Sequence, residues 1–154
     1  MAKAIEVGRY LSYLAANEEE PDYLTNMRLQ KLLYYVQAWS LVMRGRPMFG
    51  ERIEAWVHGP VVREAYQQFR KHQDAPILPD DIGDAEFDLE DDDREFISDV
   101  WGTYKVHSAS RLRQMTHEED PWINARKGYG PADKCEKEIS CDALRDYFSS
   151  LPDE

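Results

Sequence analysis

Residues 26–44 constrain the fold more than any other part of the chain. Apolar side chains recur there at three- and four-residue steps, at Leu29, Leu32, Leu33, Val36, Trp39 and Met43. This spacing places them on one face of a helix. A second set, Tyr34, Tyr35, Leu41 and Val42, widens that face. A helix that is apolar on several sides is usually surrounded by other elements, so we expect a central helix, capped by Thr25 or Asn26 and ended by Gly45.

A short strand is expected after this helix. Along residues 53–58, Ile53, Ala55 and Val57 alternate with a second set, Glu54, Trp56 and His58. A period of two is typical of a strand. If the apolar set faces the core, Trp56 and His58 lie on the outer face. Residues 59–60, Gly-Pro, end the strand, because proline has no N–H to donate and can begin the next segment.

The remaining pattern predicts a mainly α protein, a single domain over residues 1–154. Helices are expected over residues 3–17, 63–72 and 91–104, in two short segments that begin near residues 108–110 and at 121, and from residue 140 to the C-terminal end. The total is six or seven helices with a two- or three-stranded β ribbon, in which residues 137–139 pair with residues 53–57. Residues 74–90, rich in proline and aspartate, are expected to form a loop that touches the body in parts.

The charge distribution is uneven. The chain carries a net charge of −11, and ten acidic residues lie between Asp80 and Glu95. An acidic body repels phosphate backbones, so direct binding to nucleic acid, including an operator, is not expected. The acidic segment, with Asp91, Asp92 and Asp93 at its end, can instead attract a basic partner protein. The alternative is a solvated surface that serves solubility alone.

Few residues suggest chemistry. No glycine-rich phosphate loop is present, and the four histidines lack the spacing of a metal site, so neither a cofactor nor a metal is expected. One candidate partner surface remains, made of Trp56, His58 and Arg63, because exposed Trp and Arg often dominate interfaces. The alternatives are a purely structural role and a small hydrolase that uses His58 or His117. No membrane span or secretory signal is recognised, so a cytoplasmic protein is expected.

Four ordered blocks of residues resemble one family. They are residues 29–39 (LQKLLYYVQAW), 55–62 (AWVHGPVV), 112–122 with its Thr-His and Pro-Trp pairs, and 139–148. Together they are similar to the SocA-like family, the Panacea domain, also labelled phage-associated GepA. The motif positions, which we interpret as structural, are Leu32, Leu33, Tyr34, Trp39, Gly59, Pro60, Thr116, His117, Pro121 and Trp122.

The resemblance implies a function. It implies a mainly helical antitoxin, not an enzyme, which neutralises a cognate protein toxin by direct protein–protein binding. The toxin of such a protein is often encoded by a neighbouring gene. A variant of this interpretation is an adaptor that delivers the toxin to a cytoplasmic protease, and the sequence does not separate blocking from delivery.

Overall fold

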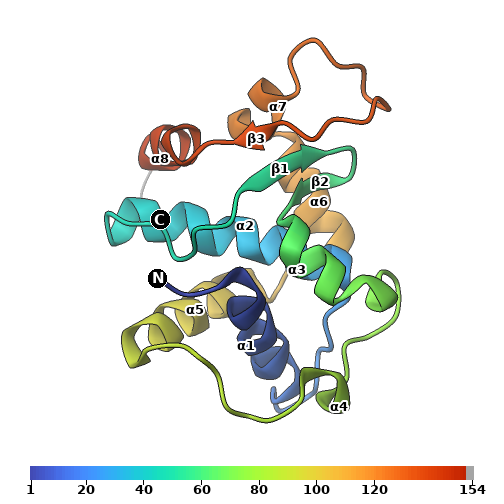
Figure 1. Ribbon diagram of the computed structural model, residues 1–154, viewed down its shortest axis with the longest axis vertical. Coiled ribbons are helices and arrows are strands. Elements are labelled where there is room, and N and C mark those ends of the chain that lie inside the picture. The colour runs from blue at the N-terminus through green and yellow to red at the C-terminus, as the bar shows by residue number, and fades with distance from the viewer. Residues whose placement is uncertain (152–154) are drawn as a thin grey trace.

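The computed structural model describes residues 1–151. These residues form eight α-helices, one short 3-10 helix and a three-stranded sheet (Figure 1). The elements in chain order are α1 (Ala4–Ala16), α2 (Asn26–Met43), β1 (Ile53–Trp56), β2 (Gly59–Val61), α3 (Arg63–Gln68), η1 (Arg70–His72), α4 (Pro79–Ile82), α5 (Asp91–Tyr104), α6 (Ala109–His117), α7 (Asp120–Ala125), β3 (Glu138–Ile139) and α8 (Cys141–Ser149). The predicted mainly α class with a small β ribbon is confirmed.

Helix α2 is the central element, as its pattern predicts. Fourteen of its eighteen residues are buried, and it packs against α1, α5, α6 and α8. The Thr25 hydroxyl caps its start by accepting from the Arg28 N–H at 3.4 Å. Gly45, with φ 72°, follows its end. One assignment is wrong: Met43 is 71% exposed, whereas Ser40 and Leu41 in the same last turn are buried.

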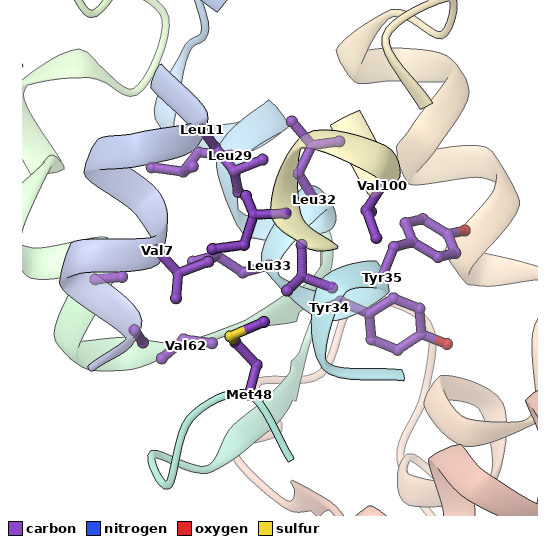
Figure 2. Close-up of a cluster of buried hydrophobic side chains, with 14 of the residues drawn as sticks. Val7, Leu11, Leu29, Leu32, Leu33, Tyr34, Tyr35, Met48, Val62 and Val100 are labelled. Atoms are coloured by element: carbon purple, nitrogen blue, oxygen red, sulfur yellow. The ribbon is translucent and has the colours of Figure 1, made fainter. Parts of the chain in front are cut away.

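The core lies around α2. In Figure 2, side chains from α1 (Val7, Leu11) and α5 (Val100) converge on Leu32 and its neighbours in α2. Leu32 and Leu33 are fully buried, so these two motif positions serve packing. At about 1.5–3 kcal/mol for each fully buried aliphatic or aromatic side chain, this cluster is the main stabilising term of the fold.

The three strands form an antiparallel sheet with the order β2-β1-β3. Ile53 pairs with Ile139, so the predicted pairing of residues 137–139 with β1 is confirmed. The expected strand end is only partly right. Trp56 pairs with Gly59 and Ala55 with Pro60, so residues 59–61 turn back as a second strand before α3 begins. Pro60 is tolerated there because β2 is an edge strand.

Residues 74–90 were expected to be a loop, and most of them are. Pro79–Ile82 form the short helix α4 within it. The Arg9 guanidinium of α1 donates to the carbonyls of Ile82, Asp84 and Glu86 at 2.7–3.1 Å. Four apolar side chains of the segment are buried, at Ile77, Ile82, Phe87 and Leu89. The expected contact with the body is therefore confirmed.

Candidate functional site

The three predicted partner-binding residues of the hairpin region, Trp56, His58 and Arg63, line one cleft. Its volume is about 460 Å³. The walls come from the β1–β2 hairpin, from α3 and from the segment before β3. The remaining lining residues are Met27, Val57, Val61, Tyr66, Gln73, Ala132, Lys134, Cys135 and Glu136. A cleft with an aromatic and aliphatic floor and a few polar groups is a typical binding site for another molecule.

Trp56 is held in a defined orientation at the cleft. Its ring meets the Tyr66 ring edge to face, with centroids 4.9 Å apart. The Arg63 guanidinium lies 5.8 Å from the ring centroid on the indole. The indole N–H donates to the Glu54 carboxylate at 2.9 Å. The half-buried indole is thus fixed before any partner arrives, which lowers the entropy cost of binding.

Glu54 shows that the outer face of β1 is not all exposed. It lies on that face with Trp56, whose indole donates to it, yet it is 4% exposed. Arg63 and Arg52 cover it, with N–O distances of 2.8 and 3.3 Å, so its charge is paired in place. Arg63 also binds Glu136 at 2.8 Å, and this bond, with Lys134, lowers the pKa of Glu136.

Val57 is a second correction on this strand. It was expected in the core, but it is half-buried and lines the cleft. The chain leaves the extended conformation after Trp56 to turn toward β2, so the period of two no longer applies at Val57 and its side chain reaches the cleft floor.

His58 is exposed at the hairpin turn. Partial desolvation of the ring lowers the pKa of His58, and the nearby cations Arg113, Lys31 and His117 lower it further. Within residues 1–151 it makes no hydrogen bond and no ion pair. Its ring is therefore not linked to a nucleophile or a carboxylate there, as a hydrolytic site would require.

Helices α6 and α7 hold the hairpin through three successive carbonyls. Arg126 donates to the Ala55 carbonyl at 2.9 Å, and the Trp122 indole donates to that of Trp56 at 2.8 Å. The third bond joins His117 Nε2 to the Val57 carbonyl at 2.9 Å.

These bonds explain the second half of the motif. The other ring nitrogen of His117 lies 2.7 Å from the Arg113 carbonyl, so both nitrogens are engaged. Thr116 is fully buried, and its hydroxyl also binds the Arg113 carbonyl, at 2.8 Å. Pro121 lies in the first turn of α7, where its missing N–H costs nothing. Arg126, which sequence reasoning missed, completes the set.

Three side chains on α2 form hydrogen bonds to backbone or hydroxyl groups of other parts of the chain. The Gln30 amide oxygen accepts from the Val62 N–H at 2.9 Å, just before α3 begins. The Lys31 ammonium donates to the Pro60 carbonyl at 3.2 Å. Trp39 donates to the Tyr104 hydroxyl at 2.7 Å. The motif on α2 is thus a set of bonds that positions the hairpin and α3 as well as an apolar face.

A buried carboxyl group joins α2 to the start of α7. Glu119 accepts from the hydroxyls of Tyr34 and Tyr35 at 2.9–3.1 Å. Burial raises the pKa of Glu119 to about 7, the two tyrosine bonds lower it in part, and Glu118 raises it further. Burial, followed by the charge of Glu119, raises the pKa of both tyrosines. Sequence reasoning placed Tyr34 in the motif but missed Glu119.

Gly59 is required by two features of the hairpin. Its φ is +116°, which other residues rarely adopt. A Cβ at this position would lie 2.5 Å from Cε of Lys31. The glycine therefore makes room for the buried lysine directly beneath the turn.

The acidic residues at the start of α5 lie away from the cleft. Asp93 pairs with Arg44 at 2.6 Å and Asp92 with Arg46 at 3.1 Å, whereas Asp91 is exposed without an ion pair inside the described part of the chain. In Figure 1 this end of α5 and the β1–β2 turn lie on opposite sides of α2. The structure does not bring the aspartates together with Trp56, His58 and Arg63.

Residues 1–151 contain no group of three His, Cys, Asp or Glu side chains placed to hold a metal ion. No helix among them has both the length and the apolar character needed to cross a membrane.

Comparison with known proteins connects this architecture to a family. The family described as "Antitoxin SocA-like, Panacea domain" matches residues 29–123, which include most of α2, the hairpin and α6. A curated relative, "Antitoxin SocA" from Caulobacter vibrioides (strain NA1000 / CB15N), is 44% identical over 46 residues, or 30% of this chain and 24% of that protein. No solved structure matches. The chain belongs to the SocA-like antitoxin family that carries the Panacea domain.

Proposed function

We propose that this protein is an antitoxin that neutralises a cognate toxin by binding it directly at the cleft of Trp56, His58 and Arg63. The supporting observation is that the motif of the family builds this cleft. Three carbonyls of the hairpin are held by α6 and α7, and the result is a fixed, half-exposed tryptophan beside an arginine. Tryptophan and arginine are the residue types most enriched among interface hot spots.

Inhibition by binding requires no chemistry from the antitoxin. A partner is inactive when its working surface is covered, and an interface of roughly 1,600 Å² is sufficient. We propose that residues 1–154 act as one domain in this complex and that the toxin is the product of a neighbouring gene. The engaged ring of His117 and the unlinked ring of His58 favour this binding role over the hydrolase alternative.

A growth assay tests the proposal. Each neighbouring gene is expressed alone and with this chain, and we expect one product to arrest growth alone and to be harmless with the wild-type protein. Trp56→Ala should abolish protection, whereas Met43→Ala, which truncates an exposed side chain at the far end of α2, should preserve it. Thermal unfolding confirms that both variants are folded. If no neighbour is toxic, or if Trp56→Ala protects fully, the proposal fails.

The same cells separate blocking from delivery. The amount of toxin is followed by immunoblot after synthesis is stopped. We expect a constant amount of toxin in a stable complex with this chain. A toxin that disappears only when the chain and a protease are both present would assign the role of adaptor instead.

A further inference from the structure

Three cationic side chains near the hairpin turn have no acidic partner. Within residues 1–151 the Arg113 guanidinium and the His58 ring make no hydrogen bond or ion pair. Lys31 is 1% exposed, and its ammonium donates to the Pro60 carbonyl alone. The ammonium has three N–H donors and the guanidinium five. The Arg113 guanidinium and the His58 ring are exposed to solvent. In a chain with a net charge of −11, a local group of cations without a carboxylate partner is a surface that attracts an anion.

Lys31 and Arg113 line one pocket that adjoins the cleft. Its volume is about 300 Å³, and it shares Met27 and Gln73 with the cleft. The remaining lining residues are Thr25, Asp74, Ala109 and Ser110. Ala109 and Ser110 begin α6, a helix of nine residues, so the positive end of its dipole also faces the pocket. Asp74 is the acidic residue of the lining, and it pairs with neither Lys31 nor Arg113.

The cations of this region act on one another. Burial, followed by the charge of Arg113, lowers the pKa of Lys31 to about 7. The pKa of His58 is likewise lowered, after desolvation, by the positive charges of Arg113, Lys31 and His117. Mutual repulsion of this kind is relieved when an anion binds between the groups. The bound anion would then act as a counter-ion and stabilise the charged form of the Lys31 ammonium.

We propose that Lys31 and Arg113, with His58 in the adjoining cleft, form a carboxylate-binding pocket. It takes an aspartate or glutamate side chain of the partner protein while an adjacent apolar side chain of that partner fills the cleft at Trp56. This inference rests on the proposed function in that the partner is the toxin. It adds the chemistry of recognition: a short segment with an apolar anchor next to an acid. The pocket and the cleft are joined through shared residues, so one segment can fill both.

A carboxylate fits better than a phosphate backbone. The net charge of −11 repels a polyanion, whereas a single carboxylate meets the local cations without approaching the acidic half of the chain. The guanidinium can bind both oxygens of a carboxylate. The apolar cleft beside the pocket requires a neighbouring side chain, which a protein segment supplies.

The pocket predicts that binding depends on pH. A bound carboxylate favours the charged ammonium, so binding draws a proton onto Lys31 above its free pKa of about 7. Between about pH 7 and 8.5 the affinity should fall, by at most tenfold per pH unit for one proton. The other charged or titratable groups that face the pocket are His58, Asp74 and Arg113. The pKa of His58 is lowered, so its titration lies below that interval. Lys31→Met should remove the dependence.

The test uses the full chain and two matched peptide probes, acetyl-Trp-Glu-amide and acetyl-Trp-Gln-amide. Each peptide is titrated into the protein to about 10 mM at pH 7, and the backbone amide signals of the protein are followed by NMR. We expect the Glu peptide to shift Gly59 and Thr116 and to bind about tenfold more tightly than the Gln peptide, as expected for one charge-assisted hydrogen-bond pair. Arg113→Gln should remove that preference. Arg111→Gln, an equal charge change on the exposed side of α6, should retain it.

Each outcome decides the inference. Equal binding of the two peptides, or no shift at Gly59 with either, overturns it. Tighter binding of inorganic phosphate or of a single-stranded RNA oligonucleotide at the same residues assigns the pocket to a phosphate ligand and also overturns it. In the growth assay, Arg113→Gln should reduce protection while Arg111→Gln does not. The peptide measurements do not need a toxin, so a failed growth assay with a positive peptide result rejects the proposed function and leaves the pocket intact.

Discussion

The buried carboxyl of Glu119 makes the stability of this fold depend on pH, and Glu119→Gln should remove that dependence. Burial raises the pKa of Glu119 from 4.5 to about 7 in the folded state. Because the folded pKa is above the unfolded value, the contribution to stability is fully present below pH 4.5 and is lost as the pH rises through about 7. Glutamine has the same shape and hydrogen-bonds the tyrosines without a charge to bury.

The expected magnitude follows from the shift. One pKa unit corresponds to about 1.4 kcal/mol, so the loss between pH 4.5 and 7 amounts to about 3 kcal/mol. The isoelectric point is ≈ 4.8, which favours precipitation near that pH, so the useful interval is about pH 5.5 to 7.5. Across that interval the free energy of unfolding of the wild type should fall by about 2 kcal/mol relative to Glu119→Gln.

Urea unfolding, followed by tryptophan fluorescence at both pH values, measures this difference. Other titrating groups, Lys31 included, are present in both proteins and cancel in the comparison. Glu95→Gln, the same substitution at an exposed position of α5, is the matched control and should run parallel to the wild type. If the wild type and Glu119→Gln also run parallel between about pH 5.5 and 7.5, the carboxyl is not buried in its charged form and the reasoning is wrong.

Two further substitutions test the hairpin. Gly59→Ala should lower the free energy of unfolding by at least about 1–3 kcal/mol, because φ is +116° and the new Cβ meets Lys31. Gly45→Ala is the control and should cost less, because the space around Gly45 is open. Equal melting temperatures of the two variants would contradict this prediction. Trp122→Phe should cost about 1–3 kcal/mol, because it leaves the Trp56 carbonyl without its donor. It should also speed amide hydrogen exchange in β1 and β2, and unchanged exchange would refute that role.

Local patterns predicted most of the fold because they report on each element and its near neighbours. The caps at Thr25, Ser108 and Ser140 each accept from a backbone N–H three residues on. The pairing of residues 137–139 with β1 followed from two short apolar runs. The end of α2 was predicted closely, but Met43 was wrongly assigned to its buried face. Periodicity within one helix does not show which positions other elements cover.

The polar residues of the core were missed for a different reason. A lysine or a glutamate is usually exposed, so sequence reasoning assigned no core role to Lys31 and placed Glu119 in a turn. Their partners lie 29 and 85 residues away along the chain, at Pro60 and Tyr34, and no local pattern reports on such distances. The burial of Glu54 was missed for the same reason, because Arg63 of α3 covers it.

The candidate site was predicted in part. Parity along β1 placed Trp56 and His58 on one face, and the structure has both of them, with the predicted Arg63, lining one cleft. That these residues bind a partner stays a prediction. The role of Asp91, Asp92 and Asp93 in attracting a basic partner also stays a prediction, with two of the three already paired to arginines.

The most direct test of the central claim is the affinity of the purified toxin for this protein, measured by titration calorimetry with the wild type and with Trp56→Ala. The partner is the neighbouring gene product that arrests growth alone and is neutralised by this chain. If Trp56 is the anchor of the interface, its truncation should weaken binding by at least about 30-fold, which corresponds to the roughly 2 kcal/mol of a hot spot. An unchanged dissociation constant for a folded Trp56→Ala would contradict the account and place the interface elsewhere.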